Sequence, residues 1–209
     1  MIRILLLGIC ALIALPAMGQ ERKYSFEVTP FVGYRIGGTF EDDNSDAEFE
    51  LDDSSSFGLV MNLRAEDNTQ WELVYSHQNT DLDSSGLLTP SDPVLSMDVD
   101  YLQLGGTYLW EGDLARPFMV ATMGLAHFDP DDSDFNSETY FSFSIGGGWK
   151  VFPTQRFGLR LEGRFYGSLI ESDSSIFCES ISGSSRCLIS TSGTVLWQWE
   201  MMAGAVFRF

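Results

Sequence analysis

Charged residues of opposite sign recur at every second position in several segments of this sequence. The alternation is clearest around Arg160, Glu162 and Arg164. Carboxylates next to guanidinium groups can form ion pairs, but buried charges are tolerated only when each one has a partner. We predict one paired network of nine residues: Glu27, Arg35, Arg64, Glu72, Arg160, Glu162, Arg164, Glu200 and Arg208. Glu66 and Lys150 share the same alternation, which gives five acids and six bases on one face.

The first nineteen residues have the features of a cleavable export signal. Arg3 supplies the positive start, residues 4–15 form a short apolar run, and Ala17-Met18-Gly19 places small residues before Gln20. The run is too short for a spanning helix, which needs about 20 residues. We therefore predict two regions, a signal peptide over 1–19 and one domain over 20–209.

The composition excludes several classes of protein. Loss of Arg3 with the signal leaves 11 basic and 30 acidic residues. Such acidity disfavours nucleic acid as a partner, because its phosphates would be repelled. The chain is also 44% hydrophobic and 13% aromatic, which disfavours disorder.

Apolar and polar residues alternate over eight segments, a pattern typical of β-strands. We predict strands over 24–38, 56–66, 70–79, 98–110, 117–128, 139–152, 157–170 and 194–209. The connections alternate between long polar segments and short turns, beginning and ending with a long one. Outer-membrane barrels have long extracellular loops and short periplasmic turns. Both termini are therefore expected in the periplasm.

The face opposite the charged residues decides between a membrane barrel and a soluble one. It carries no Asp, Glu, Lys or Arg at alternate positions of 26–36, 57–65, 71–77, 102–110, 119–127, 141–151, 157–165 and 195–209. A charge facing lipid costs about 2–4 kcal/mol at mid-bilayer, so lipid requires such a face. A soluble lipocalin-type barrel is the alternative, with its apolar face inward. Tryptophans near both ends of the segments match aromatic girdles and favour the membrane barrel.

Several motifs resemble the small outer-membrane β-barrel superfamily of OmpA-, OmpX- and OmpW-like proteins. They are Phe31-Val32-Gly33-Tyr34-Arg35, Ile145 to Phe152, Gly158 to Arg164, and Arg116-Pro117-Phe118. The terminal Phe209 resembles the signal that the outer-membrane assembly machinery reads. The resemblance implies an all-β fold: an eight-stranded antiparallel up-and-down transmembrane β-barrel in the cell outer membrane. It says little about activity.

Two cysteines and two acidic loops remain to be explained. In an exported protein, the pair Cys178 and Cys187 predicts a disulfide that pins a loop, and the spacing is not the Cys-x-x-Cys of redox enzymes. The loops over 39–55 and 129–138 are rich in carboxylates, which suit calcium or magnesium. The spacing does not match an EF-hand, so we favour solvated loops over a metal site. Weak cation bridging to lipopolysaccharide is the alternative.

The sequence predicts a non-enzymatic barrel with a lumen filled by paired charges and a structural or surface-interaction role. The expected partners are outer-membrane lipid, lipopolysaccharide and the assembly machinery, with no cofactor and a monomeric state. One alternative is a narrow pore or an OmpW-like conduit for small molecules. A second is a lipid A-modifying enzyme, which would use His77 or His127. We disfavour this alternative, because no nucleophile motif surrounds a serine.

Overall fold

The computed structural model describes residues 25–41, 48–83, 94–131, 137–170, 175–181, 184–190 and 195–209. The signal peptide predicted over 1–19 lies outside these residues. Among the described residues, no helix has the length and apolar character needed to cross a membrane.

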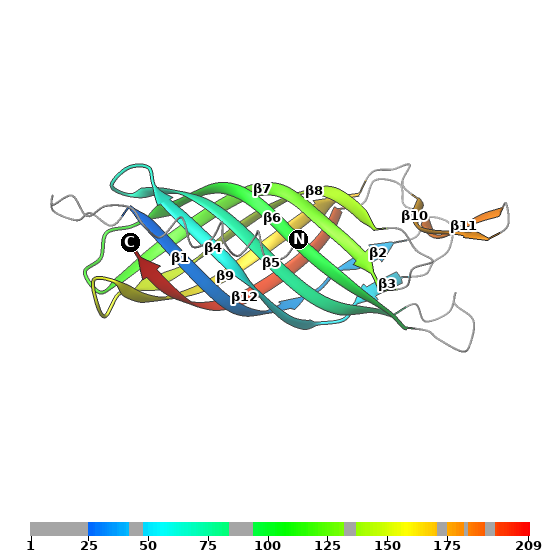
Figure 1. The fold of residues 1–209 in the computed structure, drawn as a ribbon, viewed down its shortest axis with the longest axis horizontal. Helices are drawn as coiled ribbons and strands as arrows, with labels where there is room; N and C mark the ends of the chain where they lie inside the picture. Colours follow the sequence, from blue (N-terminus) through cyan, green and yellow to red (C-terminus); the bar gives the residue numbers. More distant parts are fainter. Residues whose placement is uncertain are drawn as a thin grey trace, which may run out of the picture.

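Eight long strands form one closed antiparallel barrel (Figure 1). They are β1 (Phe26–Ile36), β4 (Ser54–Arg64), β5 (Thr69–Asp83), β6 (Val94–Leu109), β7 (Ala115–Pro130), β8 (Glu138–Val151), β9 (Phe157–Leu169) and β12 (Val195–Arg208). Each strand pairs with the next along the chain, and β12 pairs with β1. The predicted eight-stranded up-and-down fold is confirmed.

The two ends of the barrel differ. The short turns and the C-terminus lie at one end, and the strand ends that flank the long connections lie at the other (Figure 1). The backbone amide of Ser25 donates to the carbonyl of Phe209 at 3.2 Å, so the described chain also begins at the short-turn end.

Some residues predicted to be loop are strand. β2 (Thr39–Glu41) pairs with β3 (Glu48–Leu51), and β3 pairs with β5. β10 (Ser175–Ile181) and β11 (Ser184–Ser190) form a separate hairpin beyond the rim. β5 and β6 also pair further than predicted, as far as Asp83 opposite Val94. Backbone pairing does not depend on an apolar outer face, so the polar sequence of these segments hid it.

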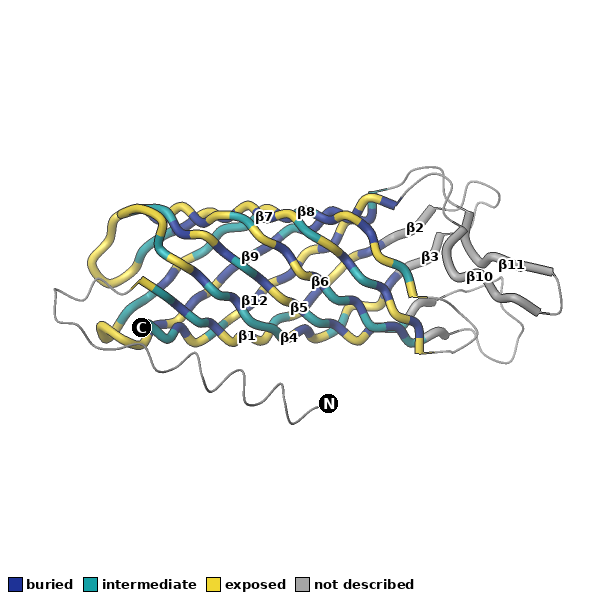
Figure 2. The backbone as a smooth tube through the Cα atoms, turned by 45° about the horizontal axis from the view of Figure 1, so that its top comes forward, coloured by how far each residue is buried: buried dark blue, intermediate teal, exposed yellow. Residues whose placement is uncertain are grey.

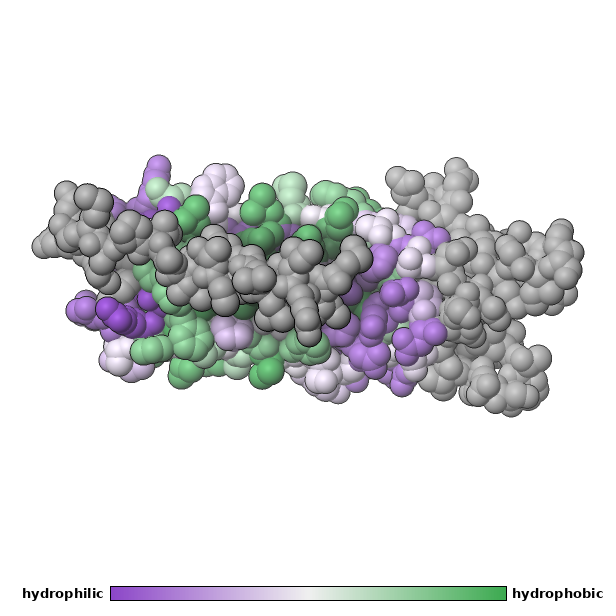
Figure 3. Space-filling view, viewed as in Figure 1, coloured by the Kyte–Doolittle hydropathy of each residue, from purple (hydrophilic) through white to green (hydrophobic). Residues whose placement is uncertain are grey.

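Buried and more exposed residues alternate along the barrel strands (Figure 2), as expected when successive side chains point to the lumen and to the outer surface. On the outer surface Val32 is 68% exposed and Met123 is 63% exposed. On the face that Figure 3 draws, hydrophobic residues gather along the middle of the barrel and hydrophilic residues lie toward both ends. These outward apolar residues in the middle of the barrel form an apolar belt. The belt exposes far more apolar surface than a protein in water normally does, which is the arrangement that lipid requires.

The outer face is not free of charge at its loop end. Asp98 and Asp100 of β6 occupy the outward alternation, and so do Asp81 of β5 and Asp129 of β7. The prediction of an uncharged outer face therefore holds only for the middle of the barrel. The strands continue above the belt, where a carboxylate can remain hydrated.

Adjacent glycines of β6 give a test of how tightly the wall is packed. A Cβ on the inward Gly105 would overlap the backbone carbonyl oxygen of Ala121, whereas one on the outward Gly106 would meet only the carbonyl oxygen of Gln70 at 3.6 Å. We expect Gly105→Ala to lower the free energy of unfolding by about 1–3 kcal/mol, the usual cost of overpacking. Gly106→Ala should match the wild type. Urea unfolding in detergent, followed by tryptophan fluorescence, checks this, and equal stability of the two variants would contradict it.

Candidate functional site

Four charged side chains form a closed ring in the middle of the lumen. Arg160 contacts one oxygen of Glu72 at 3.0 Å and donates from Nε to one oxygen of Glu162 at 2.6 Å. Arg164 contacts the second oxygen of Glu72 at 2.5 Å and donates from Nε to the second oxygen of Glu162 at 2.8 Å. Each carboxylate therefore bridges both guanidinium groups. This bridging gives the paired, charge-assisted contacts that buried charges need.

The ring spans the barrel from one wall to the other. Glu72 lies on β5, and the other three members lie on β9. In the closed strand order, β5 and β9 are four strands apart in either direction, so they face each other. Thr107 and Asn62 also donate to Glu72, at 2.6 and 2.8 Å. The ring is thus a brace between opposite walls.

A second group of charges lies nearer the short turns. The ammonium of Lys150 donates to Glu27 at 2.7 Å and to Gln70 at 2.8 Å. Arg208 donates to the other oxygen of Glu27 at 2.9 Å, and its guanidinium stacks on the ring of Phe152. This group links β1, β5, β8 and β12 at the short-turn end.

The third charged group lies nearer the loops. Arg35 donates to Glu200 at 3.1 Å and lies over the rings of Tyr101 and Tyr166. Ser76 and Tyr166 donate to Glu200 at 2.9 and 2.7 Å. Cation–π contacts of this kind strengthen when water is excluded.

An apolar cluster fills the lumen between this third group and the loops. It includes the two tyrosines that cover Arg35 and eight further residues: Leu51, Met97, Val99, Ala126, Phe128, Tyr140, Ile170 and Leu196. Phe128 is 2% exposed and Met97 is fully buried. The loop end of the lumen is therefore packed with apolar side chains, while the rest holds the charges together with two smaller apolar clusters, Phe31, Val60, Val74 and Met202, and Leu109, Phe118 and Val120.

Eight of the nine residues predicted for the network lie in these three groups. Arg64 does not, because its side chain is 28% exposed at the barrel end and lies 4.0 Å from Asp67 of the adjacent turn. Lys150, which shared the alternation but was left out of the predicted network, is fully buried within it. Neutral partners such as Asn62 and Ser76 were also missed. Their position on the inward alternation was the only signal that pointed to them.

Both histidines lie on the outer surface near the loop end. The ring of His77 lies 2.9 Å from Asp100 and 3.8 Å from Asp98, and Tyr75 also donates to Asp100. His127 bonds Thr139 at 2.8 Å. The polar side chains that contact the two imidazole rings are aspartate and threonine, so these contacts bring no serine or cysteine nucleophile to either histidine. Among the described residues, no group of three or more His, Cys, Asp or Glu is arranged to hold a metal ion.

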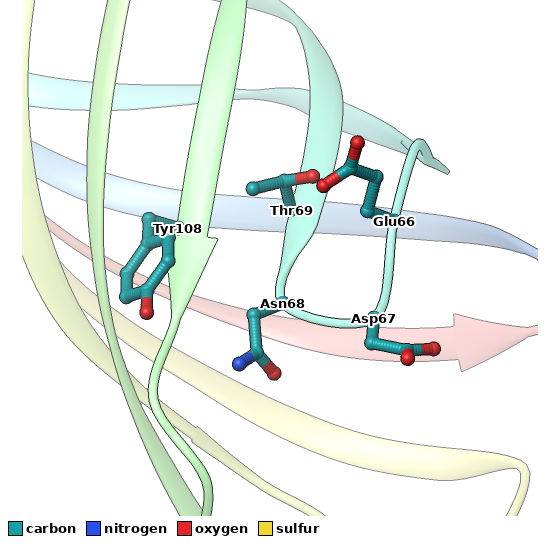
Figure 4. A pocket seen from close by; sticks show the side chains of 5 residues that line it. All are labelled: Glu66, Asp67, Asn68, Thr69 and Tyr108. Atoms are coloured by element: carbon teal, nitrogen blue, oxygen red, sulfur yellow. The ribbon is translucent and has the colours of Figure 1, made fainter.

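An open pocket of about 560 Å³ lies at the turn between β4 and β5. It is lined by residues of the turn and by Tyr108 of β6 (Figure 4). The carboxylates of Glu66 and Asp67 point in different directions (Figure 4). This pocket therefore offers no converging acids for catalysis.

Solved structures show the same fold. Neisserial surface protein A superposes with a TM-score of 0.59 at 13% identity, covering 88% of this chain and 97% of that one. The outer membrane protein OprG from Pseudomonas aeruginosa gives 0.58 at 14% identity, covering 88% and 95%. AlkL, solved in lipid bilayers, gives 0.54 at 11% identity, covering 94% and 95%. No curated protein matches the sequence.

The family described as "Outer membrane protein beta-barrel domain" matches residues 7–175, well over half of the chain. The match ends before β12, the strand that closes the barrel between β9 and β1. This family match, with the closed barrel and its apolar belt, indicates the outer membrane. The chain therefore belongs to the outer membrane protein β-barrel domain family.

Proposed function

We propose that this protein is a non-enzymatic, integral outer-membrane barrel with a sealed lumen and a structural or surface-interaction role. One observation supports this above all: the charges in the middle of the lumen are out of reach of water. Arg35, Glu72 and Arg164 are each 0% exposed. A conducting pore keeps its charged lining hydrated, so charges this deeply buried favour a plug.

The long connections are the surface available for interaction under this proposal. The described strands carry outward carboxylates toward that end, and the adjoining connections are acidic in sequence. If the short-turn end faces the periplasm, this acidic end faces outward and meets lipopolysaccharide. A surface of this charge favours cationic partners or bridging cations.

Biogenesis completes the proposal. Phe209 directly follows β12 at the closing seam, where it exchanges backbone hydrogen bonds with Phe26. An aromatic residue next to the closing strand suits recognition by the outer-membrane assembly machinery. We propose a monomer that is inserted with both ends in the periplasm.

A conduit for small apolar molecules is the second candidate function. The apolar cluster at the loop end of the lumen favours it, because this cluster would accept an apolar molecule more readily than an ion. Faster uptake of an apolar dye by liposomes that hold the protein than by empty liposomes would support the conduit over the plug.

Conductance tests the sealed lumen directly. We expect the purified protein to give no steady single-channel openings in planar lipid bilayers, because the charged ring and the apolar cluster both block the lumen. Steady openings whose ion selectivity changes in Arg160→Gln would contradict the proposal.

The ring can be tested through stability. Glu72→Gln keeps the shape of the side chain but leaves two buried guanidinium groups with one carboxylate. We expect a loss of about 3–5 kcal/mol in the free energy of unfolding, as when one partner of a buried ion pair is removed. The matched control is the exposed Glu66→Gln, expected within about 0.5 kcal/mol of the wild type. Urea unfolding measures the free energy of unfolding of both variants. Equal values for the two variants would contradict a brace between opposite walls.

The cysteine pair gives a separate prediction. The register of β10 and β11 sets Cys178 directly opposite Cys187. Cα atoms of opposed residues in an antiparallel pair lie about 4.5–5.5 Å apart, within the range of a disulfide. We expect mass spectrometry of the exported protein, alkylated without reduction, to show neither thiol modified. Two alkylated cysteines would refute the bond.

A further inference from the structure

The seam between β1 and β12 lacks one backbone hydrogen bond. The two strands pair in continuous register except at Thr29 and Pro30. Phe26 and Phe209 exchange hydrogen bonds, so every second residue from Phe26, including Pro30, directs its backbone toward β12. Proline has no N–H to donate. The carbonyl of Ala205, which faces Pro30, therefore loses its ladder donor.

A second polar group is unpaired at the same point of the seam. On the lumen side, the Thr29 hydroxyl is fully buried and has no hydrogen-bond partner among the described residues. Proline inside a sheet is found mostly at edges or bulges, because the lost bond destabilises the ladder. Pro30 instead lies in the wall of a closed barrel, where lipid offers no water to replace the bond.

An apolar groove of about 410 Å³ lies on the outer surface over this point. Its floor is β12, which contributes only the small residues Ala203, Gly204 and Ala205. Its sides are Val32 of β1 and Leu159 and Leu161 of β9, each more than half exposed. Neighbouring strands lie about 5 Å apart, so the flanking strands leave a groove about 10 Å wide between their backbones. That width suits one hydrocarbon chain.

The height of the groove selects the part of a lipid that would reach it. Pro30 lies four residues along β1 from Phe26, which is at the short-turn end of the barrel. The groove therefore lies in the half of the barrel wall nearer the short turns. A lipid whose acyl chain fills the groove could keep its glycerol near the headgroup boundary at that end.

We propose that this groove binds a single-chain lipid with a free hydroxyl next to its acyl chain, such as a monoacylglycerol or a lysophospholipid. The chain lies along the small residues of β12, and the hydroxyl donates to the carbonyl of Ala205. This site is separate from the sealed lumen. A lipid is favoured over a protein because the groove is flanked by side chains of the lipid-facing belt.

The barrel provides its own control groove. A cavity of about 370 Å³ lies on the outer surface of β5, β6 and β7, around Trp71, Gly106 and Ala121. There the ladder is continuous, with Gly106 opposite both Trp71 and Ala121. This second groove has a similar volume, but the backbone ladder beneath it is unbroken, so it should not select for a hydroxyl.

The experiment uses a monoacylglycerol with a photoreactive diazirine in its chain, added to the full protein in phosphatidylcholine nanodiscs. Phosphatidylcholine has no hydrogen-bond donor and cannot compete for the carbonyl. We expect labelling of β1, β9 and β12 peptides to exceed that of β5 to β7 peptides by roughly fivefold, the worth of about one hydrogen bond. The same probe with both hydroxyls methylated should label the two grooves equally.

Variants complete the test. Pro30→Val restores the missing N–H and should abolish the preference without harming the fold. Ala203→Phe, which fills the groove beside Pro30, should abolish labelling of that groove. The matched Ala121→Phe fills the control groove and should leave labelling beside Pro30 intact. Equal labelling of both grooves by the hydroxylated probe, or a preference that survives Pro30→Val, would overturn the proposal. A preference shared by the methylated probe would also overturn it, since any apolar chain would then suffice.

Discussion

The structure depends on one constraint: the outer face of this barrel meets hydrocarbon, so its polar side chains must fit inside a ring of eight strands. A lumen of eight strands is just wide enough for side chains to fill. Charges placed there lose their water and must find partners within a few ångströms. The ring of Glu72, Glu162, Arg160 and Arg164 meets this requirement, because each carboxylate has one oxygen for each guanidinium group.

The same ion pairs also connect strands on different sides of the barrel. The ring joins β5 to β9, while Lys150 joins β8 to Glu27 on β1. These bonds cross the lumen, so they stabilise strands that have no backbone contact with each other. A lumen braced in this way leaves little room for ions. Under the proposed function, interaction then belongs to the ends and the outer wall of the barrel.

The barrel is uneven along its axis and around its wall. The charged groups lie between the short turns and the loop end of the lumen, beside two small apolar clusters, whereas the loop end holds the largest apolar cluster, with residues such as Phe128 and Met97. Outside, carboxylates such as Asp98 and Asp100 replace the apolar belt at the loop end. The wall also has a point without a ladder bond, at Pro30. Each departure from a uniform cylinder marks a place where contact with lipid or a partner differs.

Alternation and connection lengths determined the closed eight-stranded barrel, its two unlike ends and the inward side of eight network residues. Alternation reports only which face a side chain occupies. It does not report height along the barrel or the residue across the lumen. Only the tertiary structure therefore decided that Arg64 lies at the rim, that Asp98 and Asp100 lie beyond the apolar belt near the loop end, and that Glu72 pairs with arginines about 90 residues away. Partners in the lumen are set by strand stagger and closure, which bring together residues that no local pattern connects.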